Sequence, residues 1–218
     1  LWNAAFFGGS LLAALAQGFM LGHYISGFEH SFGAYAFSVL ISICVVAGYG
    51  LLGATWLIMK SEHGLQKKAL RWAQGALWLT ALGIAAVSIA TPLISTRVFD
   101  KWFAFPQFLL LSQIPAISIA LILACHFRLR KLAKKIDTRE WEPFAFAVSI
   151  FLLAFAGLAY SLFPYLIIDE MTIWEAASAT SSLQFILWGV VITLPAILGY
   201  TVFAYRVFWG KTRELSYD

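Results

Sequence analysis

The sequence predicts an all-α protein, a polytopic bundle of transmembrane helices, on three observations. Of the 218 residues, 61% are hydrophobic and only 12% are charged, about half the charged fraction of soluble chains. The mean hydropathy is +0.81. The apolar runs are long enough to cross a hydrocarbon core of about 30 Å, for which a helix needs about 20 residues. Spanning strands are excluded, because the runs are too long and do not alternate.

Six apolar segments reach this length, and we interpret residues 1–218 as a single transmembrane helical domain. The predicted spans are 3–27, 36–60, 70–94, 104–127, 143–167 and 181–208. The loops between them are short, so no soluble domain is expected. Because the chain begins at Leu1 and no signal-peptide pattern precedes the first run, we interpret it as a piece that lacks an N-terminal part.

Features within the spans predict how the helices pack. Pro115 and Pro195 fall inside spans and are expected to bend them. Small residues recur four apart, a spacing that lets helix backbones approach closely. These pairs are Gly9 and Ala13, Gly18 and Gly22, and Gly50 and Ala54. Cys44 and Cys125 each lie in an apolar run, so we expect buried, reduced thiols rather than a disulfide or a metal site.

The loops predict the orientation of the bundle. All of the 15 Lys and Arg residues except Arg97 and Lys101 lie in or beside the 60–71 and 128–139 loops or in the C-terminal tail. By the positive-inside rule these basic loops and the C-terminus are cytoplasmic. The opposite face carries Glu29, Asp100, Asp169, Glu170 and Glu175. The formal charge of +4 therefore reflects topology, and no nucleic-acid partner is expected, because that would need a basic face on a soluble surface.

The spans contain few side chains that could take part in catalysis or transport. Their central stretches hold Gln17, Gln113 and Gln184 but no charged side chain, whereas ion-coupled transporters mark their pathways with buried charges. We interpret each glutamine as an interhelical hydrogen bond, with a substrate contact as the alternative. The Asp169–Glu170 pair is interpreted as a solvated loop rather than an acid–base or cation site. The basic run 128–135 fixes topology and is also suited to anionic lipid headgroups.

The histidines do not predict a haem held by this chain. Two axial ligands must lie at similar depth on facing helices. His23 falls near the outer end of the first span and His126 at the inner end of the fourth, while His30 and His63 lie in loops. A haem here would need a ligand from another chain.

One stretch at the end of the second span resembles a known family. Residues 53–62, GATWLIMKSE, resemble a signature of subunit II of the cytochrome bd-type quinol oxidases, and are most similar to the cyanide-insensitive branch. The resemblance continues through 65–66, 71–73, 163–165, 172–178, 204–205 and 208–210. The residues singled out as the family signature are Gly53, Thr55, Trp56, Lys60, Glu62, Pro164, Trp174 and Glu175. His63 stands where the family usually has Gly.

The resemblance implies a terminal oxidase of the respiratory chain that oxidises quinol and reduces dioxygen to water in the bacterial cytoplasmic membrane. It implies about three further helices before Leu1 and a heterodimer with subunit I, which would carry haem b, haem d and the quinol-oxidising loop. No catalytic, cofactor-binding or metal-binding residue carries over onto this chain, which would act as structural partner. A structural quinone, membrane lipids and a small accessory subunit are further expected partners. The alternatives are a secondary transporter and a self-sufficient b-type cytochrome.

Overall fold

The computed structural model describes residues 2–105, 109, 111–134, 138–168, 170–208 and 210–211. These residues form seven helices and one two-stranded hairpin, which confirms the all-α class. In chain order the elements are α1 (Trp2–Ile25), α2 (Phe32–Lys60), α3 (His63–Ile94), α4 (Thr96–Phe103), α6 (Gln113–Ala133), α7 (Glu142–Leu162), β1 (Tyr165–Ile167), β2 (Met171–Thr172) and α8 (Thr180–Val207). The antiparallel hairpin β1–β2 lies in the loop between α7 and α8, and it was not predicted.

Five of the described helices are long and apolar enough to cross a membrane: α1, α2, α3, α7 and α8. The fourth predicted span, 104–127, falls partly on residues 106–108 and 110, which lie outside the described part. The helix that follows them, α6, begins at Gln113 and continues to Ala133. Pro115 therefore lies in the first turn of α6, where proline is tolerated, and the bend expected in the 104–127 span stays a prediction. Pro195 does lie inside α8, as predicted.

Two helix starts come earlier than the apolar pattern predicts. α3 begins at His63 rather than at residue 70, because the Leu-Gln-Lys-Lys-Ala run at 65–69 favours helix although it is polar. α2 begins at Phe32, where the Ser31 side chain accepts a hydrogen bond from the Ala34 amide at 3.2 Å and so caps the helix.

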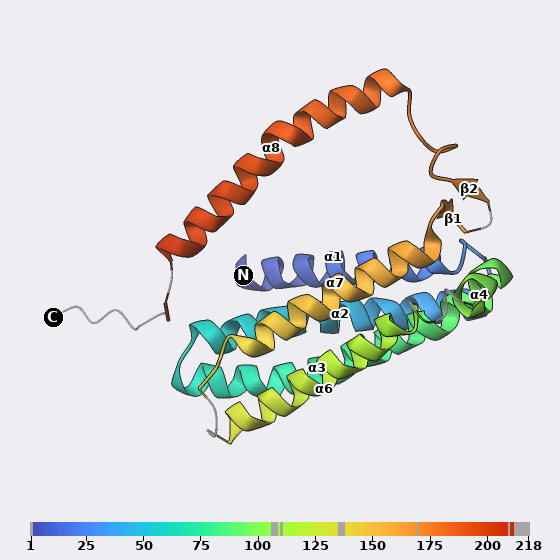
Figure 1. Cartoon of the computed structure of the whole chain (residues 1–218). Helices are drawn as coiled ribbons and strands as arrows, with labels where there is room; N and C mark the ends of the chain where they lie inside the picture. The colour runs from blue at the N-terminus through green and yellow to red at the C-terminus, as the bar shows by residue number, and fades with distance from the viewer. Residues whose placement is uncertain are drawn as a thin grey trace.

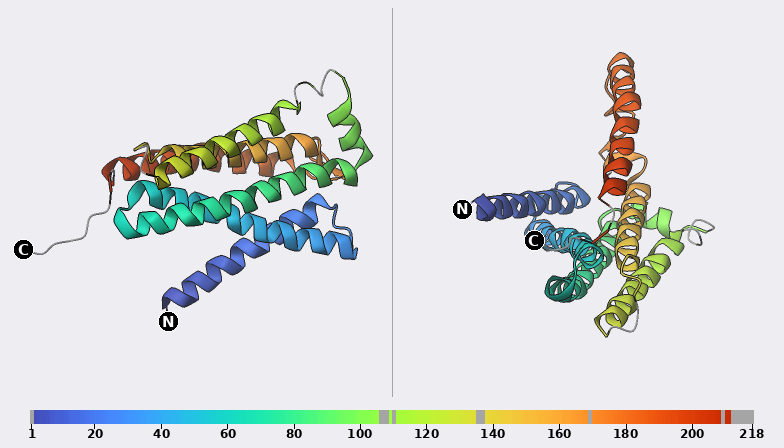
Figure 2. Two further views of the ribbon diagram at one scale, coloured as in Figure 1. Left: turned by 90° about the horizontal axis from the view of Figure 1, so that it is seen from below. Right: turned by 90° about the vertical axis from the view of Figure 1, so that its left-hand side faces the viewer.

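The helices α2, α3, α6 and α7 lie side by side as a bundle (Figure 1). We call the end that holds Lys60 and Glu142 the inner end, and the end that holds α4 and the hairpin the outer end. The second half of α1 packs on α2, whereas its first half points away from the bundle. α8 stands apart in another direction (Figure 2), and it has no buried residue.

The well-packed core lies in the inner half of the bundle. Its buried members are Leu51, Ala54, Ile58, Ala69, Leu70, Ala73, Leu77, Ile122, Cys125, Leu129, Leu132, Ala147 and Ile150. Cys44 and Cys125 are buried and free, as expected. Interior positions of this kind are close-packed, so the inner half is the rigid part of the bundle.

The contact between α1 and α2 depends on two glycines. A Cβ atom placed on Gly18 or Gly22 would lie 2.5 Å from the Cα atom of Ser42 or Ser38, respectively. The predicted close approach is therefore confirmed for this pair. Around Gly9 and Gly50, by contrast, such a Cβ atom would meet no described atom within 4 Å.

Candidate functional site

The eight signature residues do not form one site. Gly53, Thr55, Trp56, Lys60 and Glu62 lie at the inner end of α2 and in the turn that follows it. Pro164, Trp174 and Glu175 lie in the outer loop between α7 and α8. The two groups stand at opposite ends of the bundle, so each must be explained by its own surroundings.

Trp56 joins three helices at the inner end. Its ring lies edge-on to Phe144 of α7, with 5.2 Å between centroids, and to Tyr205 of α8, with 5.3 Å. The ammonium of Lys60, one turn along α2, lies 5.2 Å from the centroid of the Trp56 ring. This geometry suits a cation–π interaction. Trp56 is thus a packing residue between α2, α7 and α8.

Lys60 fastens the end of α8. Its Nζ donates to the carbonyls of Phe208 at 3.1 Å and Gly210 at 3.2 Å. A lysine suits this position, because the last carbonyls of a helix lack partners and carry partial negative charge. An ion pair holds the segment after α8 as well, because Lys211 Nζ lies 2.7 Å from Glu140 Oε2.

Gln66 links this ion pair to the bundle. Its Nε2 donates to the Ile58 carbonyl at 3.0 Å and to Glu140 Oε1 at 2.7 Å. Glu140 therefore bridges α3 and the segment after α8. We call this set the inner brace, and its members are Trp56, Lys60, Gln66, Glu140, Tyr205 and Lys211. Sequence reasoning assigned no role to Gln66, Glu140 or Lys211 in joining these elements.

The other two signature residues of α2 differ in their surroundings. Thr55 is buried, and its hydroxyl donates to the Leu51 carbonyl at 2.7 Å. This bond satisfies the hydroxyl within its own helix. Gly53 is exposed, and a Cβ atom there would meet no described atom within 4 Å. The described contacts therefore explain Thr55 but give no reason for glycine at position 53.

The turn between α2 and α3 is tight, because only Ser61 and Glu62 separate the two helices. His63 adopts φ of +53°, in the left-handed region. His63 takes this conformation although the family usually has Gly at this position. Glu62 is the N-cap residue of α3 but makes no side-chain cap, and its Oε2 lies 3.9 Å from His63 Nδ1.

A buried carboxylate lies beside the brace at the start of α7. Glu142 is only 7% exposed. Its Oε2 lies 2.7 Å from Arg128 Nε on α6, and its Oε1 accepts from Arg139 at 3.2 Å. The pair joins the inner end of α6 to the start of α7. Sequence reasoning missed it, although an acidic residue soon after a basic loop was the available signal.

The outer signature residues build a small capped turn. Glu175 Oε2 accepts from both the amide and the hydroxyl of Thr172, each at 2.8 Å. The Glu175 amide returns a bond to Thr172 Oγ1 at 3.3 Å, which completes a reciprocal capping box. The hydrogen bonds from Thr172 lower the pKa of Glu175 below its ordinary value. Glu175 is thus a structural acceptor.

Pro164 and Trp174 hold the same loop against the end of α7. The Pro164 carbonyl accepts from the Ile173 amide at 3.0 Å. The Trp174 ring lies edge-on to Phe163, with 6.0 Å between centroids, and remains largely exposed. Of the acidic pair at this end, Asp169 lies outside the described residues, so the interpretation of the pair stays a prediction.

The outer end of α7 is capped by a cation from α4. Lys101 Nζ donates to the carbonyls of Tyr160 at 2.6 Å and Phe163 at 2.7 Å. The neighbouring Trp102 donates from Nε1 to Ser161 Oγ at 3.0 Å. Desolvation by burial lowers the pKa of Lys101 below its ordinary value. Lys101 thus donates to the carbonyls at the end of α7, as Lys60 does at the end of α8. The sequence did not predict this role.

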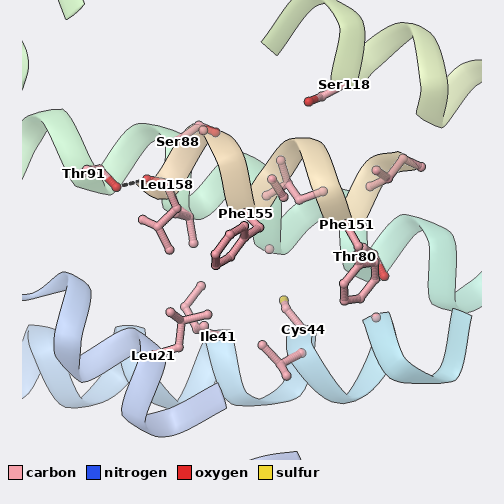
Figure 3. Close-up of a pocket in the computed structure, with 18 of the residues that line it drawn as sticks. Leu21, Ile41, Cys44, Thr80, Ser88, Thr91, Ser118, Phe151, Phe155 and Leu158 are labelled. Atoms are coloured by element: carbon pink, nitrogen blue, oxygen red, sulfur yellow. Dashed lines mark hydrogen bonds between the residues drawn. The ribbon is translucent and has the colours of Figure 1, made fainter. Parts of the chain in front are cut away.

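A pocket of about 550 Å³ opens in the bundle, lined by α1, α2, α3, α6 and α7 and by Trp102 of α4 (Figure 3). Leu21, Ile41, Phe155 and Leu158 point into it.

The three glutamines do not gather at this pocket. Gln17 lies on its lining, and its Oε1 accepts from the Tyr49 hydroxyl of α2 at 2.9 Å. The interpretation of Gln17 as an interhelical hydrogen bond is therefore confirmed. Gln113 begins α6 and Gln184 is exposed on α8. The polar midplane site that a transporter would need is not assembled from these residues.

The histidines lie in two separate groups. At the outer end the His23 ring stacks on Tyr35, with 5.5 Å between centroids, and lies 5.7 Å from His30. At the other end of the bundle His126 lies edge-on to Trp78, with 5.2 Å between centroids. His23 and His126 do not face each other, so they do not fit the axial positions of one haem. Within the described ranges, no three His, Cys, Asp or Glu residues group as metal ligands.

These features define a class, a polytopic helical membrane subunit whose polar side chains mainly tie its own helices together. The family model for cytochrome bd terminal oxidase subunit II matches residues 1–208, and the chain belongs to this family. It is accordingly a multi-pass protein of the inner membrane.

Curated relatives carry the corresponding name. The chain is similar to cytochrome bd-I ubiquinol oxidase subunit 2 of Escherichia coli strain K12, and to the proteins of the same name from E. coli O6:H1 and O157:H7. Each is 25% identical over 262 residues, an alignment that covers 98% of this chain and 66% of the relative. The chain thus spans just under two thirds of the length of these relatives.

Proposed function

We propose that this chain serves a cytochrome bd-type terminal oxidase, which oxidises quinol and reduces dioxygen to water, as part of its non-haem subunit II. The observation that carries the proposal is the family match over residues 1–208. The relatives named as ubiquinol oxidase subunits support the same reaction class. In this proposal haem b and haem d belong to subunit I, the partner in a heterodimer. A structural quinone and a small accessory subunit are further members of the proposed assembly.

The contacts of the signature residues support a structural role for the chain. Trp56 and Lys60 join α8 to α2, and Glu175 caps a turn in the outer loop. Lys60 and Glu175 hydrogen-bond to other parts of the same chain, and the Trp56 ring packs against Phe144 and Tyr205. Because these signature residues hold the chain's own elements together, they support a structural role for it beside a partner that carries the redox groups. No observation favours the transporter alternative, and we do not pursue it.

The test uses the full-length subunit, expressed with and without subunit I in cells that lack other quinol oxidases. We expect quinol-dependent oxygen uptake, together with haem b and haem d bands in reduced-minus-oxidised spectra, only when both subunits are present. The subunit purified alone should be colourless. A haem spectrum from the subunit alone, or unchanged oxygen uptake in its absence, would overturn the proposal.

A further inference from the structure

The pocket occupies the outer half of the bundle. Ile150 marks the boundary, because it belongs both to the packed inner core and to the pocket lining. Beyond it the helices diverge around the hollow that Figure 3 shows. On the inner side a Cβ atom on Gly48 would lie 2.7 Å from the Phe151 ring, and one on Gly83 would lie 2.5 Å from Cys44 Cβ. The inner side is thus tightly closed.

The lining offers a hydrocarbon surface. Its hydroxyls on Thr80, Thr91 and Ser161 donate to the carbonyls of Ala76, Val87 and Gly157 in their own helices, at 2.8, 2.7 and 2.8 Å. These groups therefore need no polar ligand. The lining is otherwise mainly apolar, with Ser88, Ser118 and Gln17 as its other polar side chains beside Tyr49 and Trp102, and apolar guests fill hollows of this kind.

A cation lies at the outer rim. A second, smaller pocket of about 370 Å³ shares Ser161 with the first and is lined by Lys101 and Tyr160. The ammonium of Lys101 has three N–H donors, and the carbonyls of Tyr160 and Phe163 accept from it. Carbonyl acceptors do not neutralise its charge. Ser161 thus lines both pockets, and the positive charge of Lys101 lies in the pocket next to the apolar hollow.

We propose that these two neighbouring pockets bind one phospholipid, with its phosphodiester beside Lys101 and one acyl chain inserted between α2, α3, α6 and α7. The charge complements the phosphate, and the hydrocarbon lining complements the chain. A membrane supplies this amphiphile on all sides. The inserted chain fills the space that otherwise separates α6 from α2, and so it supports the outer half of the bundle. The proposal does not rest on the proposed function.

The experiment uses the full-length subunit in membranes reconstituted with a phosphatidylglycerol that carries a diazirine on one acyl chain. After illumination, adducts are mapped by peptide mass spectrometry. We expect adducts on pocket-lining residues in 80–91 and 150–161, in addition to those on lipid-exposed helices such as α8. If adducts occur only on exposed faces, the proposal is wrong.

Matched variants identify the site. Ser88→Phe fills the pocket and should lower labelling of residues 150–161 at least about tenfold, whereas Ala85→Phe, exposed on the same helix, should leave it within about twofold. Ser118→Leu fills the pocket with a smaller change, in case the first variant does not fold. Lys101→Met should lower this labelling about fivefold and Lys67→Met should not. Unchanged labelling in both filling variants, or labelling of these peptides by a diazirine isoprenoid quinone but not by the phospholipid, would overturn the proposal.

Discussion

At His63 a residue with a side chain occupies a backbone conformation that glycine adopts more easily. Its φ of +53° lies in the left-handed region, which costs an L-residue roughly 1–2 kcal/mol. The two-residue turn between α2 and α3 requires this conformation, since α3 must reverse direction at once. The turn is formed despite the departure from the family pattern, and the strain stays local.

His63→Gly is therefore expected to raise the free energy of unfolding by about 1 kcal/mol, part of the gain being lost to the greater freedom of glycine in the unfolded chain. Thermal unfolding of the full-length protein in detergent measures the change. Lys68→Gly, at an exposed position inside α3, serves as control and should lower stability by about 1 kcal/mol. Destabilisation by both variants would show that the turn does not strain His63.

Glu175 gives a pH dependence with a defined sign. Its hydrogen bonds from Thr172 lower its pKa from the ordinary 4.5. Because the folded-state pKa is lowered, the stabilisation of the capped turn is present above the ordinary pKa. It is lost as the pH falls through the lower folded-state value.

Hydrogen exchange at the Thr172 amide, corrected for its intrinsic rate, should therefore show protection at neutral pH that falls only when the pH drops below the ordinary carboxyl pKa of 4.5. Glu175→Gln should lower the protection at neutral pH about tenfold and remove its pH dependence. Glu170→Gln, in the same loop, should behave as the parent protein does. A pH dependence that survives in Glu175→Gln would assign the effect to another group.

At the scale of elements, contacts at its two ends hold α8 in place. Since none of its residues is buried, the helix is held by the inner brace at one end and by the chain and the capped turn at the other. Lys60→Met removes both carbonyl contacts and the cation–π contact. Because these groups are partly exposed, the loss should be about 1–2 kcal/mol.

Amide exchange over residues 204–210 should then rise about tenfold in Lys60→Met, while exchange in α3 stays unchanged. Lys67→Met removes an exposed cation of the same inner end and should have no effect on these amides. An equal rise in both variants would point to net charge rather than to the brace.

The ion pair of Glu142 should respond more strongly, because it is buried. Glu142→Leu leaves Arg128 and Arg139 without their carboxylate and should cost about 3–5 kcal/mol in denaturant unfolding. The double change Arg128→Met with Glu142→Leu should recover most of this loss. Glu62→Leu, at an exposed position, should change stability by less than about 0.5 kcal/mol. No recovery in the double variant would mean that packing, not charge, is lost.

At the scale of the whole molecule, the sequence predicts features that depend on neighbouring residues. It does not predict features that depend on contacts between residues far apart in the chain. Apolar length and loop charge predicted the helical class and the order of the spans, because both are local properties. The partners of Gln66, in contrast, come from residues 58 and 140, and no periodicity relates those positions. The pocket likewise depends on how far four helices diverge.

The loops that the sequence assigned to one side of the membrane do meet at one end of the bundle, where Lys60, Arg128 and Lys211 all take part in ion pairs or caps. By the positive-inside rule we predict that this end is cytoplasmic. Cys44 and Cys125 are buried, so single cysteines can report the sidedness of the full-length protein. A membrane-impermeant maleimide should label Glu29→Cys at least about tenfold faster than Lys67→Cys in intact spheroplasts, and the order should reverse in inverted vesicles. Both side chains are exposed, so burial does not decide the difference. Labelling of Lys67→Cys from outside would invert the topology and place Lys101 and its pocket on the cytoplasmic side.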